Sequence, residues 1–174
     1  MYKAIVVNPF DIFFSVENDD IFRSKAFDTN GANYLRACLT NRTNKVFPRP
    51  EYKQCIERLK TERMENNGKF IMVSPYVQES FYVLLEFFEL PRRNVYTLSA
   101  AQGRRDITFR DICRNFELDP SEIAFFSAFT QETEDAHRYG LNTFLFAPDW
   151  DGVEFHRGPE RIARVIRSLD EIHF

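Results

Sequence analysis

Four polar side chains each follow a short apolar segment, where a buried strand would end: Asn8, Ser74, Ser99 and Ser127. The carboxyl ends of parallel strands meet at one edge of a sheet, where ligands and catalytic groups collect. None of the four is an acid, a histidine or a cysteine. Phosphoryl transfer and metal-assisted hydrolysis need an anionic nucleophile or magnesium ligands at such an edge. The residue types therefore argue against hydrolytic chemistry.

Three carboxylates, Asp11, Asp106 and Asp135, lie close to the same edge in sequence but out of line with the strand ends. An enzyme that draws its acids from these positions and uses magnesium is one alternative, with a β-bulge re-aiming Asp11. Each residue also has an ordinary structural role. Asp11 would cap a turn, Asp106 would begin a helix, and Asp135 would lie on a polar helix face. We favour the structural roles.

The elements that position these residues alternate between strands and helices. Short apolar runs predict five strands, at 4–7, 69–73, 94–98, 123–126 and 142–146. Helical spacing predicts helices at 50–66, 75–90, 106–117 and 130–139, with Ser74 as the N-cap of the second. A last helix is expected from Pro159, with Ile162, Val165, Ile166 and Leu169 on one face.

This alternation predicts a single α/β domain with a three-layer, Rossmann-like fold. Its five-stranded parallel sheet would carry helices on both faces. Residues 15–47 lack a sustained helical period, and the sequence Asp28-Thr29-Asn30-Gly31 predicts a tight turn between short segments that pair. We interpret 15–47 as an inserted flap after the first strand.

Composition and charge narrow the function classes. The chain is 44% hydrophobic and carries a formal net charge of −3, so no overall basic field attracts nucleic acid or an anionic membrane. Cys38, Cys55 and Cys113 show no CxxC spacing, which predicts buried free thiols and no metal site. No apolar segment reaches 18 residues, and the N-terminal residues do not show the charged region and long apolar run that we would expect of a leader. We expect an intracellular protein, with cytoplasm and nucleus left open.

The order of these segments resembles the haloacid dehalogenase (HAD) superfamily, and most closely its magnesium-dependent phosphatase branch. In that family the first strand ends in DxDxT, where the first Asp is the nucleophile and the second is the general acid. Here Asn8, Phe10 and Ile12 stand in that frame. The resemblance covers nearly the whole chain, and 15–47 falls where the family commonly carries a flap insertion.

The later motifs of the family are a hydroxyl residue, a lysine and a pair of magnesium-binding acids. The resemblance places Ser74 at the hydroxyl, Arg105 (or, less well, Arg104) at the lysine, and Ser127 and Ala128 at the acid pair. All four acidic positions are thus replaced, while the two phosphate-binding positions keep a hydroxyl and a cation. The resemblance implies a lineage without the family's reaction.

The sequence therefore predicts a pseudophosphatase, without catalytic residues, metal or cofactor, that binds a protein partner through the flap. One alternative is a sensor that holds phosphate or a phosphorylated ligand with Asn8, Ser74 and Arg105, near a helix N-terminus. The other is the enzyme with non-standard acids, the only case that calls for magnesium. The identity of the partner and the oligomeric state are not predicted.

Overall fold

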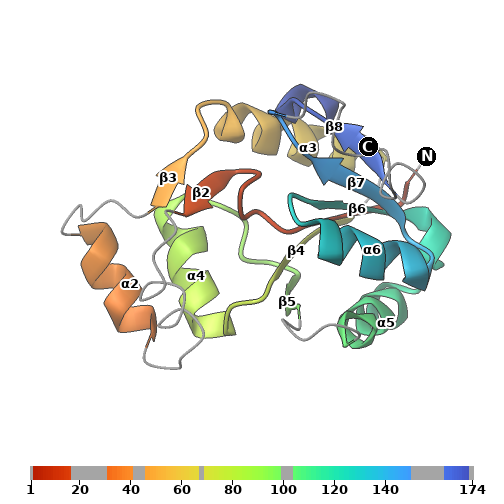
Figure 1. Ribbon diagram of the computed structural model, residues 1–174, viewed down its shortest axis with the longest axis horizontal. Helices are drawn as coiled ribbons and strands as arrows, with labels where there is room; N and C mark the ends of the chain where they lie inside the picture. Colours follow the sequence, from red (N-terminus) through yellow and green to blue (C-terminus); the bar gives the residue numbers. More distant parts are fainter. Residues whose placement is uncertain are drawn as a thin grey trace.

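A computed structural model describes residues 2–16, 31–40, 46–66, 69–98, 104–149 and 163–172. Among these residues, six parallel strands form a central sheet in the order β5-β4-β1-β6-β7-β8, and Figure 1 shows how the helices lie around it. The strands are β1 (Ala4–Val7), β4 (Lys69–Ser74), β5 (Val95–Thr97), β6 (Ile123–Ser127), β7 (Asn142–Phe146) and β8 (Arg164–Ile166). The predicted α/β class with a parallel sheet is confirmed.

The central sheet has one strand more than the five predicted. The last predicted helix was also wrong. Residues 164–166 form β8, which pairs in parallel with β7, and Leu169–Glu171 forms the short 3-10 helix η3. Pro159 and Ile162 lie outside the described residues. Val165 and Ile166 are β-branched and stiff at χ1, which favours a strand once a sheet edge is available. Their spacing to Leu169 imitates a helical stripe.

The position of β1 decides where a site can form. β1 pairs with β4 on one side and with β6 on the other, so that Val7 lies opposite both Met72 and Phe126. The chain leaves β1 toward β4 and later returns to the opposite side at β6. Such a reversal of strand order opens a crevice at the carboxyl ends of the strands. Asn8, Ser74 and Ser127 all come to this edge.

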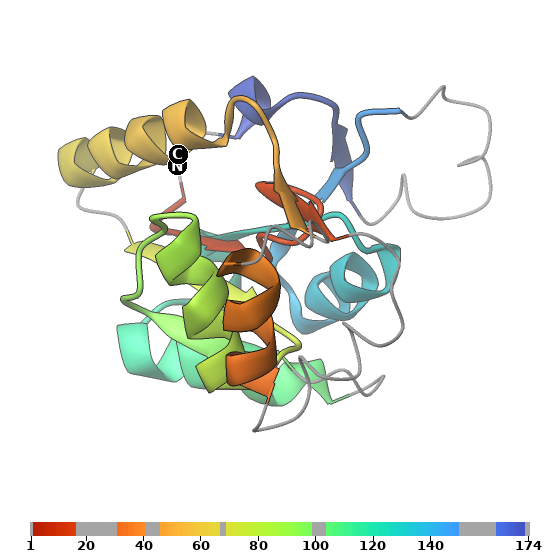
Figure 2. The same cartoon turned by 90° about the vertical axis from the view of Figure 1, so that its left-hand side faces the viewer.

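Alternate residues of the strands face two separate apolar cores. Ile5 and Val7 contribute to the larger core, with side chains of α3 (Tyr52–Asn66), α4 (Gln78–Phe87) and η3. Ala4 and Val6 contribute to the other, with α5 (Arg105–Phe116) and α6 (Thr130–Tyr139). Figure 2 shows α3 (tan) and α5 (green) on opposite sides of the sheet. The predicted covering of both faces is confirmed.

Ser74 is not the N-cap of the second helix. α4 begins at Gln78, and its N-cap residue Val77 makes no side-chain hydrogen bond. The Ser74 hydroxyl instead accepts a hydrogen bond from the Tyr76 backbone N–H at 3.0 Å, which closes a local turn around Pro75. Local bonding of this kind competes with helix capping.

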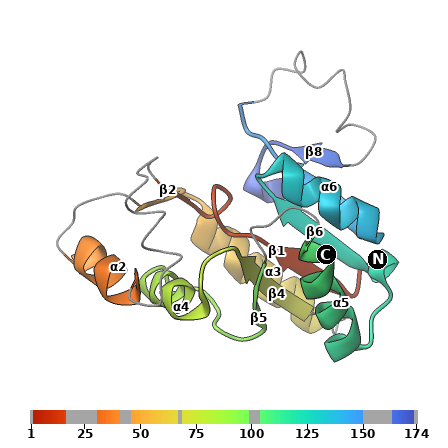
Figure 3. The ribbon, with the colours of Figure 1, turned by 60° about the horizontal axis from the view of Figure 1, so that its bottom comes forward.

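The described part of the predicted flap contains a helix, which the sequence did not predict. β2 (Phe14–Val16) and β3 (Val46–Pro48) pair antiparallel at its base, and α2 (Gly31–Thr40) lies between them in sequence. The predicted turn residues 28–30 lie outside the described residues. Figure 3 shows α2 beside α4. Leu35 is fully buried, so tertiary packing rather than a long apolar period holds α2.

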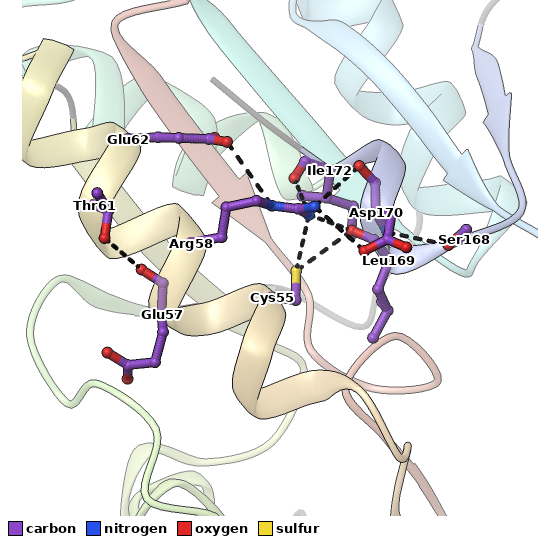
Figure 4. A network of polar contacts seen from close by, with 9 residues as sticks. All are labelled: Cys55, Glu57, Arg58, Thr61, Glu62, Ser168, Leu169, Asp170 and Ile172. Atoms are coloured by element: carbon purple, nitrogen blue, oxygen red, sulfur yellow. Dashed lines mark hydrogen bonds and ion pairs between the residues drawn. The ribbon is translucent and has the colours of Figure 1, made fainter.

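A guanidinium clasp joins the C-terminal segment to α3 (Figure 4). Arg58 Nη2 donates to the carbonyl oxygens of Leu169 and Ile172, at 2.6 and 2.7 Å, and Nη1 donates to that of Asp170 at 3.1 Å. The Cys55 thiol lies against the same group, 3.8 Å from Nη2. Burial raises the pKa of Cys55 to about 11, so the thiol stays protonated at neutral pH. As predicted, Cys55 is buried and free.

Among the described residues, no helix combines the length and the apolar character that crossing a membrane requires.

Removing the clasp should destabilise the fold. We expect Arg58→Ala to lower the free energy of unfolding by about 2 kcal/mol, because three carbonyl oxygens lose a charged donor. That loss corresponds to a fall in Tm of roughly 4–8 °C. Arg58→Lys keeps the charge but not the planar fork, and should lose less. Urea unfolding measures both variants.

Arg92→Ala is the matched control for Arg58→Ala. Arg92 pairs only with the exposed carboxylate of Glu86, at 2.9 Å, among the contacts of the described residues. Exposed ion pairs of this kind contribute at most about 1 kcal/mol. If Arg92→Ala and Arg58→Ala lowered the free energy of unfolding equally, the clasp would contribute no more to stability than an exposed ion pair.

Candidate functional site at the ends of the central strands

Asn8, directly after β1, is fully buried and bonds to a carboxylate from α6. Its side-chain Nδ2 donates to both carboxylate oxygens of Glu132, at 3.1 and 2.9 Å. Its Oδ1 accepts from the Phe10 backbone N–H at 3.2 Å. The amide orientation is thus fixed by a donor on one side and an anion on the other.

Ser127, at the end of β6, bonds to the same carboxylate. Its hydroxyl donates to Glu132 Oε2 at 2.7 Å and accepts from the Phe129 backbone N–H at 3.0 Å. We call Asn8, Ser127 and Glu132 the Glu132 network. It joins the ends of the two central strands β1 and β6 through one side chain of α6, and its three members are at least 95% buried.

Burial raises the pKa of Glu132, and desolvation is the largest cause. The hydrogen bonds from Ser127 and Asn8 and the positive charge of Arg105 lower the pKa, but do not cancel the cost of burial. Burying a carboxylate without hydrogen-bond donors would cost the folded protein several kcal/mol of stability. The hydrogen bonds from Asn8 and Ser127 therefore offset part of the free-energy cost of burying this carboxyl group.

Arg105 forms a second buried contact with α6. Its Nη1 donates to Asp135 Oδ2 at 2.5 Å, and both side chains are less than 10% exposed. Asp135 Oδ1 lies 3.5 Å from Arg138 Nη1 and accepts no hydrogen bond from a described residue. The cation at the start of α5 is therefore already paired with an anion of the same protein.

Ser74 and Ala128, two of the remaining predicted positions, lie near the same edge without joining the network. Ser74 is fully buried and serves the turn to Tyr76. Ala128 is half-buried and packs against the larger core. Ser99 lies outside the described residues, and Arg104 is the exposed N-cap residue of α5.

Phe10 belongs to the apolar core. Only 5% of the residue is exposed, and its ring centroid lies 4.9 Å from that of Phe14, 4.5 Å from that of Tyr76 and 6.0 Å from that of Phe81. Ile12 is fully buried in the same core. The side chains of Phe10 and Ile12 therefore pack in the apolar core at the positions where the resemblance would place an acid and a hydroxyl.

Of the three acids considered at first, only Asp135 is buried, and it is paired. Asp11 has a left-handed φ of 58°, and its carbonyl oxygen accepts from Arg49 Nε at 3.0 Å. Asp106 lies exposed in the first turn of α5. In the described part of the chain, no three His, Cys, Asp or Glu side chains come together in a group that could hold a metal ion.

Sequence reasoning missed Glu132. It lies in a helix expected to be polar, and acidic residues are rarely buried unless paired. One signal was present: Glu132, Asp135 and Ala136 share one face of α6, and that face is buried. Nothing in the sequence indicated that Asn8, 124 residues away, would meet this face.

Solved structures of known proteins share this fold. A dehalogenase superposes with a TM-score of 0.64 at 13% identity, over 98% of this chain and 95% of that one. A HAD family hydrolase from Deinococcus radiodurans with bound phosphate and sodium gives 0.63 at 11% identity, over 98% and 93%. CbbY from Rhodobacter sphaeroides in complex with phosphate gives 0.64 at 13% identity, over 98% and 96%.

A scan against models of protein families and a search of curated protein sequences found no match. Because these structural neighbours share only 11–13% of their residues with this chain, they establish the fold and not the activity.

The burial of Glu132 predicts a pH-dependent stability. A carboxyl whose pKa is higher in the folded than in the unfolded state binds its proton more tightly when folded, so it favours folding most at low pH. That advantage disappears as pH rises from about 4.5 through the raised pKa of Glu132. We expect wild type to lose stability relative to Glu132→Gln over this interval, measured by urea unfolding at a series of pH values.

Glu171 provides a control of opposite sign. Backbone N–H groups of Arg167 and Ser168 donate to its carboxylate, and they lower the pKa of Glu171. Its stabilising contribution is present above about pH 4.5 and disappears as pH falls through the lowered pKa. Wild type should therefore lose stability relative to Glu171→Gln on acidification. The same trend in both variants would contradict the assignment for Glu132.

Proposed function

Because this chain has the fold of the haloacid dehalogenase superfamily, we propose that it is a catalytically inactive pseudophosphatase that serves as a protein-binding module. The Glu132 network carries this proposal. The resemblance places Asn8 at the family's nucleophile and Ser127 at a magnesium ligand. In this chain both side chains donate to one buried carboxylate of α6.

A carboxylamide has no nucleophilic anion, and a hydroxyl engaged with a carboxylate is a weak ligand for magnesium, which prefers carboxylate and water oxygens. Phe10 replaces the family's general acid with a buried ring. The positions that the resemblance assigns to the nucleophile, the acid and the metal ligands therefore hold groups that bond to Glu132 or pack in the larger core. These replacements support a scaffold without turnover.

Glu132 is also the feature that favours the second candidate, an enzyme with non-standard acids. A buried carboxyl with a raised pKa beside strand ends is a frequent property of catalytic sites. Both of its oxygens, however, accept hydrogen bonds from Asn8, and Oε2 accepts a further one from Ser127. A carboxylate held in this way is poorly placed to attack phosphorus or to take up a metal. We rank this candidate below the binding module.

The phosphate sensor receives less support from the geometry. Its cation, Arg105, is paired with Asp135 in a buried contact. A phosphate at this edge would also meet the negative charge of Glu132. Binding would therefore have to displace an internal ion pair and overcome like-charge repulsion.

Exposed aromatic side chains support a protein partner. Phe47 of β3, in the predicted flap, is 44% exposed, and Phe87 of α4 is 52% exposed. Large rings of this kind anchor many protein interfaces. Among the described residues, only Ile107 joins them as an exposed large apolar side chain. Flap and α4 are thus the candidate binding region.

The direct test is a phosphatase assay. We expect the purified protein, with magnesium and p-nitrophenyl phosphate, to release product no faster than its Glu132→Gln and Asn8→Ala variants, because no step depends on these side chains. Turnover that either variant abolishes would overturn the proposal. Turnover lost in Glu132→Gln alone would establish the enzyme with non-standard acids instead.

A second test restores acids at the two network positions. Asn8→Asp/Ser127→Asp brings three carboxylates together in a buried place, which should cost about 3 kcal/mol or more, equivalent to a fall in Tm of roughly 6–12 °C. Magnesium should recover much of this loss by bridging the carboxylates. Thermal unfolding with magnesium and with EDTA measures the effect.

Phe10 stays unchanged in this variant because an acid in the apolar core would unfold the protein by itself. Wild type is the control, and we expect its Tm to be the same with magnesium and with EDTA. A destabilised variant that gains nothing from magnesium would show that Asn8 and Ser127 do not correspond to metal-facing positions.

A further inference from the structure

A groove between α2 and α4 lies on the surface, away from the strand edge described above. Figure 3 shows the two helices side by side. The groove has a volume of about 240 Å³ and is lined by Arg36, Leu39 and Thr40 of α2 and by Val83, Glu86 and Phe87 of α4. Small-molecule sites usually enclose roughly 300–1,000 Å³. The size fits an inserted side chain better than a free ligand.

Phe87 is an exposed ring at the wall of this groove. It is 52% exposed, and its centroid lies 5.1 Å from that of Phe88 in an edge-to-face contact. Phe88 is almost completely buried, so it holds the exposed ring from below. An aromatic side chain has only two χ angles, so it loses little conformational entropy when it enters a partner.

The two helices also bring opposite charges to the groove. Arg36 comes from α2 and Glu86 from α4. Arg36 Nη1 donates to Asn33 Oδ1 at 3.3 Å, and Glu86 Oε2 lies 2.9 Å from Arg92 Nη2, both on the exposed surface. Exposed contacts of this kind are weak and exchange readily. The face therefore offers a ring, a groove, a cation and an anion at once.

We propose that a second copy of this chain occupies the groove. An interface with two-fold symmetry uses the same patch on both partners, so the patch must be complementary to itself. Here Phe87 of each copy enters the groove of the other, and Arg36 of each faces Glu86 of the other. In the proposed dimer, α2 and α4 of one copy pack against α2 and α4 of the other. This dimer is independent of whether the strand edge performs catalysis.

Sedimentation velocity over a micromolar concentration series tests the dimer. We expect the wild-type mass to rise with concentration from 20.6 kDa toward twice that value. Phe87→Gln should abolish the rise, because it removes the ring from both halves of the interface. Ile107→Gln, which changes an exposed apolar side chain on α5, outside the candidate binding region, should leave the rise unchanged. Both positions are half-exposed, so both variants should fold, and circular dichroism checks this.

Charge reversal tests the pairing. Arg36→Glu alone should weaken association by about tenfold or more, because it places two carboxylates opposite each other across the interface, and it does so twice in a symmetric dimer. The double variant Arg36→Glu/Glu86→Arg exchanges the two charges and should recover most of the association.

A wild-type protein that stays monomeric at every concentration overturns the proposal and leaves the groove to a different protein. A dimer that Phe87→Gln does not change, or that the double variant does not recover, overturns it as well.

Discussion

The central strand ends of this protein depend on one buried carboxylate, which needs hydrogen-bond donors from both of them. Glu132 lies where β1 and β6 end, away from water, and its charge is tolerated because Asn8 and Ser127 donate to it. The residue types at both strand ends follow from this requirement. An acid at either position would add repulsion to desolvation, and an apolar residue would leave the carboxylate without a donor. Strand ends and helix are thus chemically interdependent.

The same helix repeats the arrangement one turn later. Asp135 follows Glu132 by three residues and receives Arg105 from the start of α5, so two successive turns of α6 carry buried carboxylates that bond to other elements of the chain. The negative charge of this edge comes from a helix, and each charge has a partner within the chain. The polar side chains of this edge therefore bond to one another. The strands contribute two neutral donors, Asn8 and Ser127, to the carboxylate of Glu132.

Much of this architecture could be predicted because apolar runs closed by polar residues mark buried parallel strands. That pattern placed Asn8, Ser74 and Ser127 at one edge correctly. It was wrong where a run was short: Val165 and Ile166 fit a helical stripe as well as an edge strand, and α2 depends on packing rather than on its own period. Glu132 was missed because its partners come from distant segments of the sequence, and because acidic residues are usually expected on the surface.

The pairing of charges bears on which kind of ligand suits the protein. At the strand ends Arg105 is already paired with Asp135, so a phosphate that approached would have to compete with this buried ion pair. Binding energy is more readily available on the outer elements, where Phe87 and Phe47 expose large apolar surface. We therefore propose that the outer elements, rather than the strand ends, recognise another surface.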